Sequence, residues 1–263
     1  MPSVQQLTLI ALLCICSTVN AADWPQFRGP SGNATASDSD PPTTWSDSEN
    51  IVWKTALPGR GASSPIVSGK HVFLTAYTGF GVDAQEPGDK ANLRLHVLCF
   101  ERNSGKLLWD KSIKASPSTQ KLSQRIADHG YATATPATDG EAVYASFGVS
   151  GVVACDMDGN LLWQAAIGDG TAGFGSAASP VVYDDLVYVN ASIESNTLFA
   201  FDKRTGRKVW KMESIMKSWT TPCIAEVPDG PPELILNQKN EIFAFDPVTG
   251  KKLWWSAGVE DYI

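Results

Sequence analysis

The residues of this chain that could bind a metal or transfer a proton are few and widely separated. The three histidines, His71, His96 and His129, lie in different segments and lack the spacing of a zinc site. The sequence contains neither a Gly-x-Ser-x-Gly nucleophile motif nor a phosphate-binding glycine loop. We therefore predict neither catalytic residues nor a metal site, and we favour a non-enzymatic role.

One acidic run resembles the start of a calcium-binding loop. It reads Asp156-Met157-Asp158-Gly159-Asn160, and it lacks the distal glutamate that completes an EF-hand loop. Because the run falls where related segments of the chain have a turn, we interpret it as a structural turn.

The cysteines indicate neither a disulfide framework nor a metal site. Cys99, Cys155 and Cys223 follow an N-terminal leader that contains the other two cysteines. Their number is odd and their spacing is wide, which fits neither a disulfide scaffold nor a metal knuckle. We expect them to be small apolar residues in strands, and the sequence leaves open whether all three are free.

A repeated glycine–tryptophan pair organises the chain. Each repeat has a glycine four residues before a tryptophan: Gly105 and Trp109, Gly159 and Trp163, Gly206 and Trp210, Gly250 and Trp254. Trp53 ends a similar strand without the glycine, and successive tryptophans are 56, 54, 47 and 44 residues apart. That period is typical of one four-stranded blade of a β-propeller.

Two further features recur in every repeat. An apolar strand ending in an acid precedes each glycine, at Glu101, Asp156, Asp202 and Asp246. Earlier in each repeat stands a Ser-Pro or Thr-Pro pair, which we expect to begin a strand because proline lacks an N–H. These pairs are Ser64-Pro65, Thr135-Pro136, Ser179-Pro180 and Thr221-Pro222.

The repeat predicts an all-β fold of antiparallel four-stranded blades with tryptophans packed between blades. A blade this small needs neighbours to bury both of its faces, which assigns the tryptophans to packing. The expected blades are residues 62–113, 131–166, 176–213 and 218–257, after a lead segment at 22–50 and a lone strand at 51–55. The lone strand needs partners, so we expect an incomplete ring; a closed four-bladed ring with a spare strand is the alternative.

These residues resemble the PQQ-like (pyrroloquinoline-quinone-type) β-propeller repeat, whose blades carry Ala-x-Asp-x-x-Thr-Gly-x-x-x-Trp. The segments 200–210 and 244–254 match fully, whereas the first repeat has Cys99, Glu101 and Ser104 at the Ala, Asp and Thr positions. Trp24-Pro25-Gln26-Phe27-Arg28-Gly29-Pro30 is similar to the start of exported, BamB-like bacterial members. This resemblance implies a bacterial envelope protein and a ring of about eight blades.

The N-terminus predicts export. The apolar run Leu7–Cys16 is too short to span a bilayer comfortably, and Val19-Asn20-Ala21 is typical of a cleavage site. We therefore expect residues 1–21 to be a signal peptide and the mature chain to be periplasmic or secreted, without a membrane span. The formal net charge of -7 argues against binding nucleic acid, because no basic surface is available for phosphates.

Three longer insertions are the candidates for binding, because loops carry binding in propellers. They are residues 78–94, residues 115–135, which include Arg125, His129 and Tyr131, and residues 168–176, which include Phe174. The leading hypothesis is a scaffold that docks a protein or polysaccharide through these loops, without a cofactor. The alternatives are a PQQ- and calcium-dependent quinoprotein dehydrogenase and a carbohydrate-binding propeller.

Overall fold

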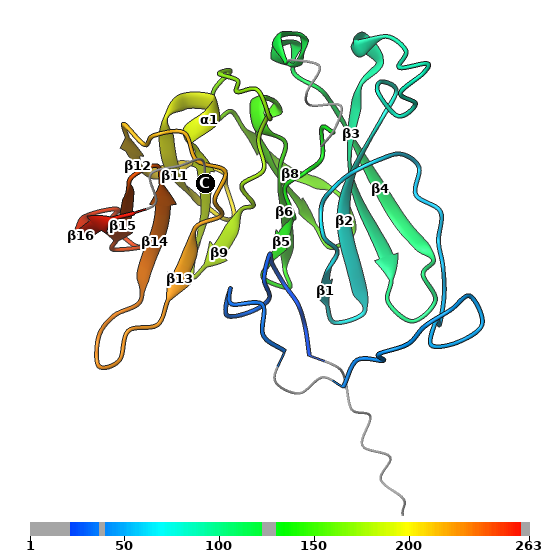
Figure 1. The fold of residues 1–263 in the computed structure, drawn as a ribbon, viewed down its shortest axis with the longest axis horizontal. Helices are drawn as coiled ribbons and strands as arrows, with labels where there is room; N and C mark the ends of the chain where they lie inside the picture. The colour runs from blue at the N-terminus through cyan, green and yellow to red at the C-terminus, as the bar shows by residue number, and fades with distance from the viewer. Residues whose placement is uncertain (1–21, 37–39, 123–129, 259–263) are drawn as a thin grey trace, which may run out of the picture.

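The computed structural model describes residues 22–36, 40–122 and 130–258, which form an all-β fold. The described strands make four antiparallel sheets of four strands each, and the strands of each sheet follow one another in chain order. Figure 1 shows the four sheets side by side in an arc that does not close. The predicted blade architecture and the incomplete ring are confirmed.

Each sheet is one blade, numbered 1 to 4 along the chain. Blade 1 contains β1 (Ile66–Ser68), β2 (His71–Thr78), β3 (Arg94–Glu101) and β4 (Leu107–Lys114). Blade 2 contains β5 (Ala137–Thr138), β6 (Ala142–Ser146), β7 (Val152–Asp156) and β8 (Leu161–Ala165). Blade 3 contains β9 (Val181–Tyr183), β10 (Leu186–Ala191), β11 (Thr197–Asp202) and β12 (Lys208–Glu213). Blade 4 contains β13 (Cys223–Ala225), β14 (Glu233–Gln238), β15 (Glu241–Phe245) and β16 (Lys252–Ala257).

In the described part of the chain, four short helical turns lie in the connections between strands. They are η1 (Lys90–Asn92), η2 (Pro117–Lys121), η4 (Gly148–Ser150) and α1 (Ser192–Ser195). Within the described ranges, no helix is long and apolar enough to cross a membrane.

The inner blades bury both faces because apolar residues occupy successive positions of their strands, and successive side chains point to opposite faces. In blade 2, Val143 packs into the cluster shared with blade 1, whereas its neighbour Tyr144 packs into the cluster shared with blade 3. A third cluster joins Tyr188 of blade 3 to Leu234 of blade 4. The core is therefore a series of inter-blade layers.

Three tryptophans of the repeat, Trp109, Trp163 and Trp210, lie against the glycine turn of the following blade. The Trp163 indole N–H donates to the carbonyl oxygen of Lys203 at 2.9 Å, and a Cβ added at Gly206 would lie 2.6 Å from the Trp163 ring. Gly206 also has a φ of +69°, so both the conformation and the space require glycine there. Trp109 and Trp210 make the same contacts with Gly159 and Gly250, donating to the carbonyls of Met157 and Pro247.

The segment at 51–55 differs from the expected lone strand. No strand is formed there, because none of the described residues supplies a neighbouring strand to pair with. Trp53 nevertheless lies against Gly105 of blade 1 and donates to the Arg102 carbonyl oxygen at 2.8 Å. Thr55 donates to the Gly105 carbonyl oxygen at 2.7 Å, so side chains alone hold this segment on blade 1.

The Ser/Thr-Pro pairs do more than begin strands. The first strand of every blade begins directly after the proline, as predicted. In addition, in the first three blades the backbone N–H before the proline donates to the corresponding hydroxyl of the next blade. These bonds run from Ser64 to Thr135, from Thr135 to Ser179 and from Ser179 to Thr221, each at 3.0 Å. We call this series the hydroxyl belt.

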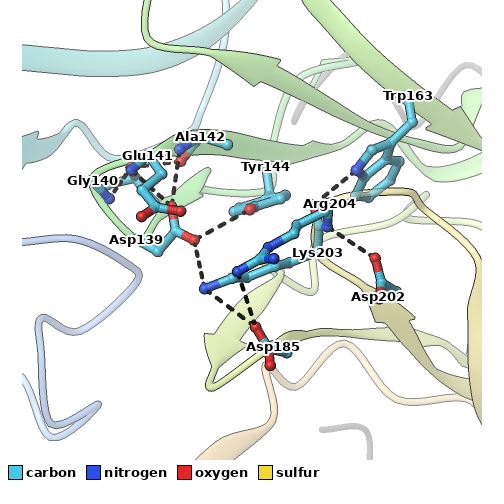
Figure 2. Close-up of polar contacts among 11 residues, drawn as sticks. Asp139, Gly140, Glu141, Ala142, Tyr144, Trp163, Asp185, Asp202, Lys203 and Arg204 are labelled. Atoms are coloured by element: carbon cyan, nitrogen blue, oxygen red, sulfur yellow. Dashed lines mark hydrogen bonds and ion pairs between the residues drawn. The ribbon is translucent and has the colours of Figure 1, made fainter.

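A polar contact also joins blades 2 and 3. Lys203 Nζ lies 3.2 Å from Asp139 Oδ2 and 4.0 Å from Asp185 Oδ1, and both Asp139 and Lys203 are largely buried (Figure 2). Burial pushes the pKa of Asp139 upward. The backbone N–H groups of Ala142 and Glu141, together with Lys203, outweigh that effect and hold the pKa below its usual value.

All three cysteines of the described chain are free. Cys99 and Cys155 are fully buried in strands, and burial raises the pKa of the Cys99 thiol to about 12 and that of Cys155 to about 11. Such thiols stay protonated and unreactive at neutral pH.

Candidate functional site

The strand order places the connections at two opposite ends of the blades. We call the end that carries the long insertions the loop end, and the end that carries the hairpins after β1 and β3 the turn end (Figure 1). In every blade the second strand leads to the third at the loop end, and the step from one blade to the next also occurs there. Among the described residues, the loop end therefore collects 79–93, 115–122, 130–136, 147–151, 166–180, 192–196, 214–222 and 239–240.

The first two insertions are in contact. The Tyr131 ring lies 5.3 Å from the Tyr77 ring, edge to face, and 6.0 Å from the Phe80 ring. Lys90 donates to the Leu122 carbonyl oxygen at 3.2 Å. Burial and the neighbouring Tyr77 raise the pKa of Tyr131, so its hydroxyl remains protonated.

The third insertion joins the second through an ion pair, with Lys121 Nζ 2.7 Å from Asp169 Oδ2. It also reaches blade 4, because the Trp219 indole N–H donates to the Gly175 carbonyl oxygen at 2.7 Å. Phe174 packs edge-on against Trp219 with ring centres 6.0 Å apart, and it remains 47% exposed. The three insertions thus lie side by side and present aromatic rings at one end of the molecule.

A small cavity of about 30 Å³ lies beneath these loops. Its lining includes Tyr131 from the second insertion and Ser176 from the third, together with Ser146 and Ser150 of blade 2. Arg125 and His129, also predicted as binding residues, lie outside the described residues. Of the four predicted loop residues, the structure places Tyr131 and Phe174 at the loop end.

Glu194 is a buried carboxyl that the sequence analysis did not identify. It lies in α1, its Oε1 accepts a hydrogen bond from the Ser176 hydroxyl, and burial raises the pKa of the carboxyl. Its backbone oxygen accepts from the Gly170 amide at 2.9 Å. Glu194 therefore ties the third insertion to the end of blade 3. A single acid in a β-rich run carries no signal of burial, so the sequence offered no means of finding it.

A larger cavity of about 1010 Å³, which we call the channel, is lined by the lead segment, by β9 and β13, and by residues before β1 and β5. The lead segment crosses the turn end, where Trp24 and Val67 exchange two backbone hydrogen bonds of 2.9 Å. The Thr138 amide donates to the Pro25 carbonyl oxygen at 2.9 Å, so the lead segment joins blades 1 and 2. Arg28 and Glu226 are the charged residues in the described lining of the channel.

Across the described residues, no group of three or more His, Cys, Asp or Glu side chains is placed to share a metal ion. In the acidic run, Asp156 Oδ1 accepts from the Asp158 and Asn160 amides, and Oδ2 accepts from the Asn160 side chain. Mainly because of the Asn160 side chain, the pKa of Asp156 lies below its usual value, as fits a turn.

His96 forms a hydrogen-bond network inside blade 1, away from both cavities. His96 is buried in β3, with Nδ1 2.7 Å from Asp110 Oδ1 and Nε2 2.8 Å from Thr78 Oγ1. No lining residue of either cavity belongs to this group. The network links three neighbouring strands of blade 1 and lacks a space for a substrate.

Comparison with known proteins gives a consistent family assignment. A family model described as outer membrane protein assembly factor BamB matches residues 93–260. No curated protein shows significant sequence similarity to the chain.

Many solved structures share the fold, among them three bacterial proteins. BamB from Moraxella catarrhalis is 19% identical with a TM-score of 0.53, and the match covers 78% of this chain and 54% of that one. Quinohemoprotein alcohol dehydrogenase from Comamonas testosteroni is 13% identical with a TM-score of 0.54, covering 91% of this chain and 42% of that one. The quinohemoprotein alcohol dehydrogenase ADHIIG from Pseudomonas putida HK5 is 13% identical with a TM-score of 0.50, covering 79% and 35%. The chain thus spans about half, or less, of the length of these relatives.

Proposed function

This chain belongs to the family described as outer membrane protein assembly factor BamB, and we propose that it is an extracytoplasmic scaffold that binds a protein at its loop end. One observation carries the proposal: insertions from successive blades meet there and hold one another in place. Lys121 pairs with Asp169, and Tyr131 packs on Tyr77 and Phe80. Loops fixed in this way present a surface that loses little entropy on binding.

The composition of this surface supports a protein partner. Phe174 is exposed and packs edge-on against Trp219. Trp219 and Tyr131 are both half-buried at the same end of the molecule. Aromatic side chains are enriched at protein interfaces because one ring buries a large area at low conformational cost. The polar residues around them, such as Lys121 and Asp169, suit the rim of such an interface.

Site-specific photocrosslinking in a Gram-negative host tests the proposal. Phe174 is replaced by p-benzoylphenylalanine, and a second protein carries the same group at Val248 in the β15–β16 turn. Both positions are exposed, at 47% and 59%, but they lie at opposite ends of the blades. We expect a discrete crosslinked product at position 174 and none at position 248.

The crosslinking pattern separates a binding surface at the loop end from its alternatives. Equal crosslinking at both positions, or none at either, contradicts a binding surface at the loop end. Selective retention of the chain on a glycan array, lost on Phe174→Ala, would assign the same surface to polysaccharide.

A titration with PQQ and Ca²⁺ tests the rival dehydrogenase function. We expect no saturable binding, because the described channel lining supplies Arg28 and Glu226 but no cluster of calcium ligands. Stoichiometric binding accompanied by alcohol-dependent dye reduction would overturn the scaffold proposal.

A further inference from the structure

The third insertion is held at its start and at its end by a single residue of α1. At its start, the Gly170 amide donates to the Glu194 backbone oxygen at 2.9 Å. At its end, the Ser176 hydroxyl donates to Oε1 of the Glu194 side chain. The segment between these two bonds includes Phe174, the exposed ring of the loop end. Glu194 therefore closes the loop that presents this ring.

Both bonds lie in closely packed surroundings. A Cβ added at Gly170 would lie 2.7 Å from the Glu194 backbone oxygen, so the start of the insertion rests directly on the backbone of α1. A Cβ added at Gly148, in η4 of blade 2, would lie 3.1 Å from Oε1 of Glu194. Glu194 is therefore covered by the third insertion and by η4, and only 5% of the residue is exposed.

No opposite charge accompanies this carboxyl in the described part of the chain. Burial raises the pKa of Glu194, and this effect outweighs the lowering by the Ser176 hydroxyl and by the Glu194 backbone amide. η4 contains no titratable residue, and α1 contains no other. The titratable residues of the other surrounding elements leave this balance unchanged; they are Asp169 of the third insertion, Lys121 of η2, Tyr131 of the second insertion, Lys217 before blade 4 and Asp202 at the far end of β11.

The neutral and the ionised forms of Glu194 fit this environment differently. The neutral acid accepts the hydrogen bond of Ser176 and needs no counter-ion. The carboxylate must either stay buried without an opposite charge or become exposed to water. Exposure requires the third insertion to move away from α1, because that insertion covers the side chain. Ionisation of Glu194 therefore favours an open state of the insertion.

We propose that Glu194 is a proton-controlled latch, which holds the third insertion on α1 while its carboxyl is neutral and releases it as the carboxylate forms. The latch determines how firmly Phe174 is held at the loop end, and its bearing on binding rests on the function proposed for that end.

The pH dependence of the latch has a defined sign. The closed insertion makes the carboxyl harder to ionise than a solvated glutamate, whose pKa is about 4.3. The stabilisation of the closed state is therefore fully present below that value, and it is lost as the pH rises through the raised pKa of Glu194.

Hydrogen exchange of the Gly170 amide in the purified chain measures the latch, because that amide bonds to Glu194. Its protection factor, which is corrected for the intrinsic effect of pH on exchange, is determined from pH 5 to pH 8. We expect a fall of about tenfold or more, because one ionising group changes an equilibrium by up to about tenfold per pH unit. The Gly81 amide, bonded to the Pro87 oxygen in the first insertion, is the internal control. A parallel loss of protection at Gly81 would contradict the latch.

Glu194→Gln is the matched variant. Glutamine keeps the size of the side chain and an oxygen that can accept from Ser176, but it does not titrate. We expect the Gly170 amide of this variant to be as protected as in the original chain at pH 5, and equally so at pH 8. A pH dependence equal to that of the original chain would overturn the proposal, because a different group would then be responsible.

Ser176→Ala keeps the test decisive if the glutamine variant does not fold. It removes the hydrogen bond to Glu194 and leaves the acid in place. Protection of the Gly170 amide should then be lower at pH 5 and should still fall toward pH 8. Unchanged protection in this variant, or constant protection in the original chain, also contradicts the latch. These measurements use the chain without a partner, so an absence of crosslinking at position 174 would count against the proposed function alone.

Discussion

At the scale of single residues, the contact between an indole and a glycine turn combines three effects. The ring buries a large apolar area, its N–H satisfies a turn carbonyl, and the missing Cβ of glycine allows the close approach. The motif therefore joins two blades: Trp163 belongs to blade 2 and Gly206 to blade 3. The glycine four residues before Trp163, Gly159, receives Trp109 from the blade before.

Truncating a docked and an undocked tryptophan should have different effects on stability. Trp163→Ala should lower the free energy of unfolding by about 3–5 kcal/mol, because it leaves a cavity and an unpaired carbonyl. Trp254→Ala should cost less than about 1 kcal/mol, because that ring is exposed in the described structure. Urea denaturation of the two variants measures both. Equal losses would contradict the assignment of these rings to blade packing.

Asp139 makes stability depend on pH in a defined direction. Its pKa is depressed in the folded state, so the ionised form favours folding above the unfolded pKa of about 3.9. The stabilisation is lost as pH falls through the folded value. Asp139→Asn should therefore cost about 1–3 kcal/mol at pH 7 and clearly less at pH 3. Denaturation of both proteins at the two pH values tests this, and a pH-independent difference would contradict it.

At the scale of the structural element, the first strand of each blade connects the blades around the channel. Strands β5, β9 and β13 begin directly after prolines, and the residue before each proline is a link of the hydroxyl belt. Each belt position thus combines a proline with a preceding hydroxyl residue. The proline has no backbone N–H, which the first residue of the strand does not require, and the hydroxyl accepts a hydrogen bond from a backbone N–H of the preceding blade.

Removing one belt hydroxyl tests its contribution. Thr135→Val keeps the side-chain shape but leaves the Ser64 amide without its acceptor, which should cost about 1–3 kcal/mol. Thr43→Val, at an exposed threonine, is the matched control and should change stability by less than about 0.5 kcal/mol. Hydrogen exchange at the Ser64 amide should accelerate only in the first variant; unchanged exchange would refute the role of the belt.

At the scale of the whole molecule, the arc separates two tasks. Docked rings and the lead segment at the turn end, together with the hydroxyl belt beside the first strands, hold the blades together. Beyond the belt, the loop end carries the insertions that meet around Tyr131 and Phe174. This division supports a binding role for the loop end, because loops on a rigid base combine precision with freedom to vary.

The leader predicts that the whole chain is exported. Protein produced with a C-terminal tag in a Gram-negative host should be released from the periplasm and begin at Ala22. Leu12→Arg, which interrupts the apolar run of the leader, should leave uncleaved protein in the cytoplasm. An N-terminal sequence that still begins at Met1 in the exported fraction would show that the segment is not a signal peptide.

The blades could be predicted from the sequence because their determinants are local. A glycine at a fixed distance before a tryptophan, an acid before the turn and a proline before the first strand each act within a few residues. The repetition of these features multiplies the signal. The difference at residues 51–55 arose because strand formation needs a pairing partner, and a tryptophan with flanking apolar residues does not supply one.

Only the tertiary structure decided which repeats touch and through what. The partner of Trp163 lies at Gly206, not in its own repeat, and the partner of the Ser64 amide is 71 residues away at Thr135. The burial of Glu194 and the meeting of the insertions likewise depend on how whole sheets stack. The sequence thus determined the unit and its number in this chain, because hydrogen bonding and turn geometry are local. How the blades pack together could be seen only in the tertiary structure, because packing brings together residues whose separation in the sequence follows no fixed pattern.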